Sequence, residues 1–504
     1  MQDMSPMRDH RLRQSTGAQA TGLTSFALLR ALALPALAVG ALGLGVTMAD
    51  ARGLETLRQA MAAAYRTNPQ LDAERARQRA TDEEVSRAHS GYRPTINATA
   101  SSTYQHTNTR PASGGEGTIT PRSVGANLTQ NLFDGFRTSS AILVAEATVR
   151  SGRETLRTVE QQVLLAAVQA YVDVVRDQAI VKLRENNVTV LSRELKATQD
   201  RFGVGEVTKT DVAQAQARRA GAVSALDLAR ANLKTSRAAY ERVIGHPPTG
   251  LTPPLPASKR MPGSLPQAIE IAMREAPTVI ASLYTEEAAR YTVDQIRATL
   301  LPQVDLRANY TATRDPSRTL DFSEVTSVTS TLTVPLYEGG GVQAQVRQAK
   351  QTHIQRLQQV EQARTEARAA VINAWSQLDA ARAAVQSDAA QVAAGQTALA
   401  GVREEEKVGQ RTLLDVLNAE QELLNAQVTL ATDQRNLVLA SYTVLSTVGR
   451  LTSEELALTS KVYDPDVHYH EVRRKWWGIS ITHGDGRRES RNLWESHGRH
   501  EAYK

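Results

Sequence analysis

Two nine-residue segments carry the polar residues whose spacing most clearly suggests a chemical role. VGEVTKTDV covers residues 204–212 and VGQRTLLDV covers residues 408–416, and each has a threonine three residues before an aspartate. This spacing resembles a helix N-cap, in which the hydroxyl and the carboxylate satisfy the free amides of the first turn. The glycine before it supplies the backbone freedom that ends the preceding helix. The alternative is that the segment is only a favourable turn sequence, which occurs twice because the gene was duplicated. The residue types alone therefore assign no further role.

No catalytic arrangement is found elsewhere in the sequence. The chain has no cysteine, which excludes disulfides, thiolate metal sites, cysteine nucleophiles and an amino-terminal lipid anchor on cysteine. The glycine run at residues 339–341 lacks the flanking residues of a nucleotide-binding loop, and we interpret it as a break between a strand and a helix. His468 and His470 could bind a metal, but their spacing fits no known scheme, and a solvated histidine-rich tail is the better interpretation. We therefore predict no enzyme activity, no metal and no cofactor.

Composition favours extended helices over a thick globular core. The chain has 504 residues, which is enough for two or three domains, but only 4% are aromatic. The formal net charge of +6 is spread thinly and forms no basic stripe. We therefore expect no nucleic-acid partner.

The first 51 residues have the pattern of a secretory signal peptide. Arginines lie near the start, an apolar stretch follows, and ADA at residues 49–51 places small residues at the two key cleavage positions. A membrane-spanning helix is the alternative, but Arg30 leaves only residues 31–46 uninterrupted, short of the roughly 20 residues that a span needs. We predict cleavage after Ala51 and export of the mature chain.

Most of the remaining chain consists of two similar halves. The two nine-residue segments lie 204 residues apart, and matching residues occur in the same order over most of both halves. Such self-similarity indicates a duplicated architecture. The proline-rich segment HPPTGLTPPLP at residues 246–256 separates the halves and cannot continue a helix.

Each half has the same predicted plan: a helix, two strands, a long helix, a turn and a return helix. The first helices are predicted at residues 54–89 and 265–299. Alternating residues predict strands at 95–107 and 122–133 in the first half, and at 302–314 and 325–337 in the second. Proline-free segments at 136–202 and 340–407 predict rods of roughly 100 Å at the helical rise. The nine-residue segments are then the tips of two helical hairpins.

These features together resemble the outer membrane efflux protein family, the TolC-like channels. The resemblance rests on the duplicated plan, on NLFDGF and PLYEGG at the strand ends, and on the VGxxTxxDV tips. It implies a mainly α fold with a membrane β-barrel, in which a homotrimer shares a 12-stranded barrel on an α-helical periplasmic tunnel. The predicted parts are a signal peptide (1–51), a first repeat (52–246), a proline-rich connector in an equatorial belt (247–262), a second repeat (263–450), and an equatorial segment with a disordered charged tail (451–504).

The resemblance also implies roles for residues at the tips. Six tip residues match positions that contact a periplasmic adaptor: Val204, Gly205, Thr208, Val408, Gly409 and Thr412. Asp415 matches an aspartate that forms a pore constriction in the trimer. One carboxylate from each of the three chains surrounds the axis there and favours cations. Arg411 matches an arginine that latches the closed state by binding its neighbour, and Thr210 and Asp211 match its acceptors. A second acidic ring is absent, because that position holds Asn418, and Glu406 replaces a tyrosine of the latch.

The implied function is that of an exit duct in the outer membrane that extends into the periplasm. It would dock with a periplasmic adaptor and an inner-membrane pump, either an ABC or a proton-driven transporter, and export small molecules or proteins by multidrug efflux or type I secretion. The alternative is a soluble periplasmic coiled-coil adaptor protein. An adaptor should carry one hairpin and flanking β-rich domains, whereas this sequence predicts two hairpins and strands of bilayer-crossing length.

Overall fold

The computed structural model describes residues 54–108, 117–257, 261–482 and 488–489. The predicted signal peptide and most of the predicted disordered tail lie outside these residues.

The first helix of each half is interrupted, where the sequence predicted one continuous helix. In the first half α1 (Leu57–Thr67) ends and α2 (Pro69–His89) begins at Asn68, whose side chain accepts a hydrogen bond from the amide of Gln70. In the second half α5 (Leu265–Glu275) and α6 (Pro277–Arg297) are divided at Ala276. The cause is a proline in each: its ring forces the preceding residue into an extended conformation, so the proline starts a new helix instead of continuing the old one.

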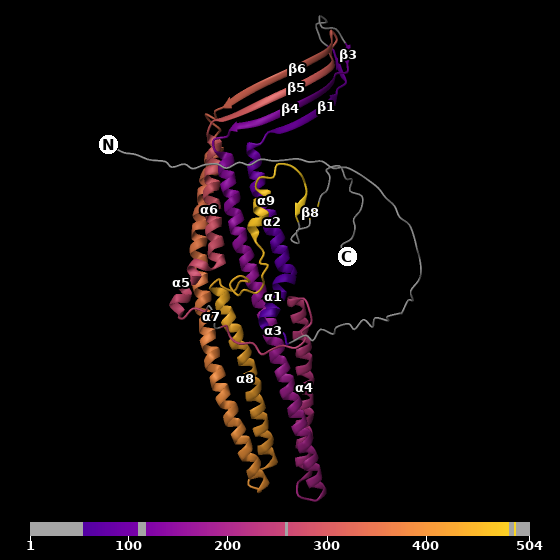
Figure 1. Ribbon diagram of the computed structural model, residues 1–504, viewed down its shortest axis with the longest axis vertical. Coiled ribbons are helices and arrows are strands. Elements are labelled where there is room, and N and C mark those ends of the chain that lie inside the picture. Colours follow the sequence, from indigo (N-terminus) through magenta and orange to yellow (C-terminus); the bar gives the residue numbers. More distant parts are fainter. Residues whose placement is uncertain (1–53, 109–116, 258–260, 483–487, 490–504) are drawn as a thin grey trace, which may run out of the picture. The chain divides into compact units, whose positions relative to one another are not determined.

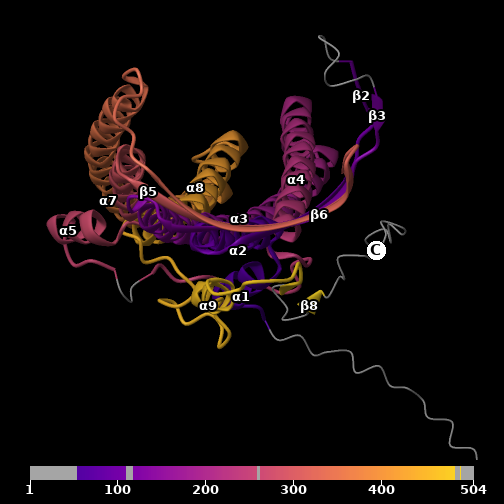
Figure 2. The ribbon, with the colours of Figure 1, turned by 90° about the horizontal axis from the view of Figure 1, so that it is seen from above.

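Four strands from both halves form one antiparallel sheet in the order β1 (Thr95–Ser102), β4 (Arg122–Phe133), β5 (Gln303–Ser317) and β6 (Leu320–Thr333). The halves meet in the middle of the sheet, where Ala126 of β4 pairs with Tyr310 of β5. The short β2 (Gln105–Thr107) and β3 (Gly117–Ile119) extend the first hairpin, and the four long strands follow an arc when seen from above (Figure 2). Short 3-10 turns, η1 (Ser90–Tyr92) and η3 (Ala298–Leu300), lead from α2 and α6 towards β1 and β5.

Two long helical hairpins extend away from the sheet (Figure 1). The first consists of α3 (Arg137–Gly203) and α4 (Lys209–Ile244), the second of α7 (Gly341–Lys407) and α8 (Leu413–Thr447). Both α3 and α7 contain 67 residues, so each is about 100 Å long. Their starts lie within a residue of the predicted ones because the glycines just before the helices adopt positive φ, 64° at Gly135 and 80° at Gly340, which directs the chain into the helix.

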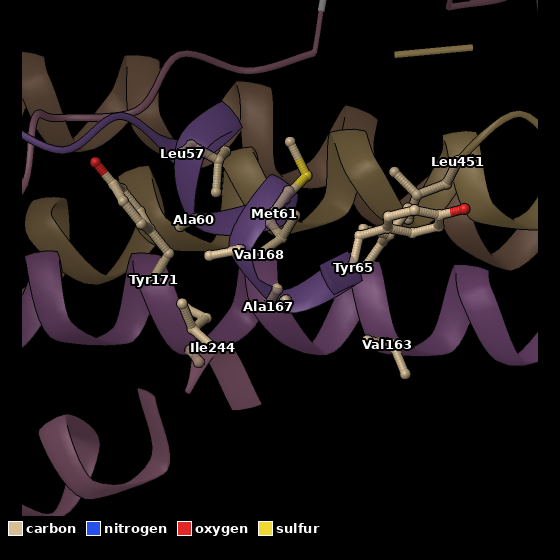
Figure 3. Close-up of a cluster of buried hydrophobic side chains, with 14 of the residues drawn as sticks. Leu57, Ala60, Met61, Tyr65, Val163, Ala167, Val168, Tyr171, Ile244 and Leu451 are labelled. Atoms are coloured by element: carbon tan, nitrogen blue, oxygen red, sulfur yellow. The ribbon is translucent and has the colours of Figure 1, made fainter. Parts of the chain in front are cut away.

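The main hydrophobic core lies where the short helix α1 packs against α3 (Figure 3). Leu57, Met61 and Tyr65 of α1 are buried together with Val168 and Tyr171 of α3. These side chains follow the helical spacing of three and four residues, which turns one face of each helix into the contact.

The proline-rich connector is fixed to this core by polar contacts. Glu55 and Leu251 form a parallel bridge, and the Tyr171 hydroxyl lies 2.7 Å from the carbonyl oxygens of both Glu55 and Thr252. Burial raises the pKa of Tyr171 to about 12, so its hydroxyl keeps the proton that these bonds need.

The segment after the second repeat contains further ordered elements. A further helix, α9 (Pro465–Val472), packs against α2, and β7 (Ile481–Thr482) pairs with β8 (Arg488–Glu489). The prediction of a solvated His468 is wrong: its side chain is 13% exposed, and Nδ1 lies 3.1 Å from Oδ2 of the fully buried Asp82. No group of three metal-ligating side chains occurs in the described part of the chain.

Across the residues that the structure describes, none of the helices is both long and apolar enough to cross a bilayer.

Candidate functional site

The candidate site lies at the two hairpin tips, at the ends of the helices farthest from the sheet (Figure 1). In the first tip Gly205 has a φ of 80°, and its amide donates to the carbonyl of Phe202 at 3.0 Å. In the second, Gly409 has a φ of 78° and donates to Glu406 at 2.9 Å. Only glycine adopts this conformation without strain, so the sequence ends both long helices at the same step.

The threonine and aspartate of each tip start the return helix, as predicted. Thr208 is the N-cap of α4, and its amide and hydroxyl donate to Oδ2 of Asp211 at 2.9 and 2.8 Å. Thr412 and Asp415 repeat the arrangement on α8, at 3.0 and 2.8 Å. These hydrogen bonds lower the pKa of both aspartates, so both carboxylates are ionised at neutral pH.

Each tip exposes an apolar side chain. Val204 is 73% exposed and Val408 is 71% exposed, although both belong to residue types that are usually buried. Each valine lies beside the turn glycine, so the tips present a small apolar surface next to free backbone.

The two hairpins contact each other near the tips through α3, α4 and α8. Leu191, Ala222 and Leu417 are buried together there, one from each of these helices. Polar bonds cross the same interface: Arg218 Nη2 donates to Asn418 Oδ1 at 2.8 Å, and Arg201 Nη1 donates to Glu406 Oε1 at 2.8 Å. Asn418 and Glu406 are the two tip positions where the sequence departs from the residues of the TolC-like channels. In this structure both side chains form hydrogen bonds between the hairpins.

Carboxylates also accumulate behind the tips. Glu420 is 7% exposed and accepts a hydrogen bond from Arg403, while its Oε2 has no partner in the described structure. The pKa of Glu194 on α3 is raised, first by burial and then by the charges of Glu420 and Glu406. Protonation of Glu194 therefore relieves repulsion between the hairpins.

The predicted latch residues lie at the tips but do not meet within one chain. Arg411 Nε donates to Glu405 Oε2 of its own hairpin at 3.0 Å, and Asp211 is engaged with Thr208. Thr210 is exposed on the first turn of α4, and Asp415 is partly exposed on the first turn of α8. Their predicted roles require a neighbouring chain and stay predictions.

The sequence did not reveal the pairing of Arg201 with Glu406. The two residues are separated by 205 positions, and no local pattern connects them. The duplication offers one weak signal: the equivalent positions of the two halves carry opposite charges, Arg201 in the first and Glu405 in the second.

Comparison with known proteins decides the family. The sequence model of the family described as "Outer membrane efflux protein" matches residues 61–246 and 268–450, one match in each half. The chain belongs to the outer membrane efflux protein family. It is therefore an outer-membrane efflux channel, and the alternative of a soluble periplasmic adaptor is excluded.

Individual relatives agree with this assignment. The chain is 40% identical to the outer membrane efflux protein BepC of Brucella suis over 85% of this chain and 93% of BepC. It is 26% identical to the outer membrane protein TolC of Escherichia coli over 82% of this chain and 86% of TolC.

A solved structure supports the fold. The CmeC outer membrane channel of Campylobacter jejuni superposes with a TM-score of 0.71 at 16% identity, covering 83% of this chain and 89% of CmeC. The family therefore confirms the predicted helical tunnel with a β-domain, and its members are channels rather than enzymes.

Proposed function

We propose that three copies of this chain assemble into one exit duct, in which four strands from each chain close a shared 12-stranded barrel in the outer membrane. The observation that carries this proposal is the open sheet. β1 pairs only with β4 and β6 only with β5, so in the described chain both outer strands keep one free edge. Free edges are costly in lipid, where no water satisfies the backbone, and joining β6 of one chain to β1 of the next removes them.

The surface of the sheet supports a membrane location. Every residue of β1 is exposed, and four large apolar side chains that share one face of β1 and β6 are more than half exposed: Ile96, Phe322, Val328 and Leu332. Apolar surface of this extent is unfavourable in water but suits contact with lipid tails. With 12, 15 and 14 residues, β4, β5 and β6 exceed the roughly 9–11 residues that a tilted strand needs to cross a bilayer.

The hairpin tips are proposed to receive a periplasmic adaptor that connects the duct to an inner-membrane pump. The exposed Val204 and Val408 would be the apolar contacts of each tip. Gly205 and Gly409 would allow close approach of the adaptor's backbone, and Thr208 and Thr412 would border the contact. An ABC or a proton-driven pump would supply the energy, so the duct itself would need no nucleotide or metal.

The inner ends of the tips are proposed to control passage. In a trimer Asp415 would present three ionised carboxylates around the axis and favour cations. Arg411 would bind Thr210 and Asp211 of the neighbouring chain in the closed state. Because Arg411 already has a partner in Glu405, closing would exchange one ion pair for another.

The division of the chain is part of the same proposal. A signal peptide (1–51) would be removed, the repeats (52–246 and 263–450) would each supply two strands and one hairpin, and the connector (247–262) with the last segment (451–504) would form a belt around the tunnel. The cargo would be small molecules, proteins or both, selected by the pump.

The assembly is tested by measuring the molar mass of the mature protein in detergent by light scattering. The proposal predicts a protein mass three times that of one chain after subtraction of bound detergent. A monomer that stays in solution without detergent would contradict it.

A further inference from the structure

A cavity of about 350 Å³ lies where α2 ends and the sheet begins, and nothing in the proposed transport function uses it. We call it the strand-root pocket. It is lined by six residues from η1 and its neighbours and from the segment after α9: His89, Tyr92, Arg93, Arg473, Arg474 and Trp476.

The strand-root pocket has an excess of positive charge. Of its three arginines only Arg473 has a charged partner, Glu146, at 2.9 Å. Arg93 donates to the uncharged backbone carbonyl of Lys475 at 2.9 Å, and Arg474 is exposed and makes no ion pair with any residue that the structure describes. Two guanidinium groups therefore face one cavity without a neutralising carboxylate, which favours an anion.

His89 places a ring nitrogen without a hydrogen-bond partner beside the arginines. Its Nε2 is buried and has no hydrogen-bond partner in the described structure. Burial, followed by the charges of Arg473 and Arg93, lowers the pKa of His89, while Glu146 opposes this shift. An anion in the pocket would compensate the charges of the arginines that surround His89.

The place of the pocket in the fold identifies the source of the anion. Tyr92 lies three residues before β1, and its carbonyl accepts a hydrogen bond from Gln130 of β4 at 3.0 Å, so the pocket is attached to the base of the sheet. Beside it, Trp476 is 70% exposed and Trp477 is 82% exposed. Tryptophan, tyrosine and arginine at this level are typical of the boundary between bilayer and water.

The side chains after the tryptophans continue the apolar surface. Ile479 and Ile481 are both more than half exposed. Arg93 lies over the ring of Trp476, 5.0 Å from its centre, which holds the aromatic ring against the charged pocket. A free phosphate would use the arginines but not this apolar border, whereas a lipid would use both.

We infer that the strand-root pocket binds the phosphate group of an anionic phospholipid, whose acyl chains lie against Trp476, Trp477 and the base of the sheet. This inference rests on the proposed function, because it requires that the sheet lies in the membrane. The last segment of the chain would then anchor each subunit to the periplasmic leaflet of the bilayer.

The test compares lipid binding to the detergent-solubilised mature protein by native mass spectrometry. The probes are palmitoyl-oleoyl phosphatidylglycerol, the zwitterionic palmitoyl-oleoyl phosphatidylethanolamine, and inorganic phosphate. We expect the wild type to prefer phosphatidylglycerol, and the variant Arg93→Gln/Arg474→Gln to bind it about tenfold or more weakly, since two charge-assisted hydrogen bonds are lost. The control Arg230→Gln/Arg382→Gln removes the same charge from the hairpins and should bind like the wild type.

Three outcomes would overturn the inference. The pocket variant could bind phosphatidylglycerol as tightly as the control, the wild type could bind both lipids equally, or millimolar inorganic phosphate could displace the lipid, which would identify a site for free phosphate. If the proposed function itself fails, no assembly of three chains is seen in the same spectra. If only the inference fails, the trimer is present and its lipid binding does not depend on Arg93 and Arg474.

A second measurement detects the lipid beside the tryptophans. In the variant Trp375→Phe/Trp494→Phe the only remaining tryptophans are Trp476 and Trp477, and excitation at 295 nm selects them over the tyrosines. Brominated phosphatidylglycerol should quench their fluorescence more strongly than brominated phosphatidylethanolamine, and adding Arg93→Gln/Arg474→Gln should remove the difference. Equal quenching by both lipids before that change would contradict the inference.

Discussion

Arg201 at the end of α3 and Glu406 at the end of α7 form an ion pair of 2.8 Å that joins the two hairpins of one chain. Glu406 is the more buried partner, with 19% of its side chain exposed against 45% for Arg201. The pair lies two or three residues before the exposed valines of the tips. Any movement that separates the hairpins at their tips must therefore break it.

Removal of this pair should favour separation of the hairpins. Partly exposed ion pairs contribute about 0.2–1 kcal/mol, so Arg201→Ala should shift the closed-to-open equilibrium by up to about fivefold per chain. The measurement is the resting conductance in a planar lipid bilayer. Arg230→Ala is the matched control, because Arg230 pairs with Glu185 at 2.9 Å within the first hairpin.

The exchange variant Arg201→Glu/Glu406→Arg should lower the resting conductance below that of Arg201→Ala, with only partial rescue because Arg201 also contacts Glu206 at 3.3 Å. Equal conductance of Arg201→Ala and Arg230→Ala would show that the pair does not hold the hairpins together.

The proposed latch predicts a separate effect at Arg411. Arg411→Ala should raise resting conductance because it removes the donor to Thr210 and Asp211 of the neighbouring chain. Glu405→Gln is the decisive control, since it removes only the partner that Arg411 has in its own chain. A latch between chains predicts higher conductance for Arg411→Ala and not for Glu405→Gln, and equal increases would assign the effect to the local pair.

Ion selectivity should depend on Asp415 and on the hydrogen bonds from Thr412. Asp415→Asn should weaken cation preference, measured as the reversal potential in a salt gradient. The hydrogen bonds of Thr412 lower the pKa of Asp415, so the wild type should keep its selectivity on acidification until the pH falls through this lowered pKa. Thr412→Val removes the hydroxyl, raises the pKa and should move the loss of selectivity to a higher pH. Selectivity that is unchanged in Asp415→Asn would place the constriction elsewhere.

Glu194 predicts how pH changes the contact between the hairpins. The pKa of Glu194 is raised in the folded chain. Protonation of Glu194 therefore stabilises the fold fully when the pH is below the unfolded pKa, and this stability is lost as the pH rises through the folded pKa. In its ionised form Glu194 repels Glu420, and Glu194→Gln should therefore stabilise the contact. Slower amide hydrogen exchange at residues 188–198 in this variant at pH 7, with a smaller difference at pH 4, is the expected result. Faster exchange would contradict it.

The sequence predicted the parts of the fold that depend on local rules. The long helices lack proline and end at glycines, so α3 and α7 were placed to within one residue. The strand β4 was predicted with its observed limits, because NLFDGF marks its end. The interruption at Asn68 was missed, since the helical pattern continues across Pro69 and only the proline ring prevents the continuous helix.

Contacts between distant residues could not be predicted from the sequence. His468 was interpreted as solvated because the histidine spacing fits no known metal site, but it lies against Asp82, 386 positions earlier. The pairing of Arg201 with Glu406 depends in the same way on how two hairpins of about 100 Å converge, which no local pattern encodes. The roles of Asp415 and of the latch residues depend on neighbouring chains and stay predictions.

The central claim is that β6 of one chain pairs with β1 of the next, and disulfide cross-linking tests it most directly because the chain has no native cysteine. Thr99→Cys on β1 is combined with single cysteines along residues 323–331 of β6, and oxidation is carried out in outer-membrane fractions. Asn127→Cys/Asn309→Cys, which pair within the sheet, control for oxidation. A shared barrel predicts covalent dimers and trimers at the position of β6 opposite Thr99 and at its nearest neighbours on the same face, two residues away, and none with either cysteine alone. Monomers at every position, while the control pair is oxidised, would contradict the shared barrel.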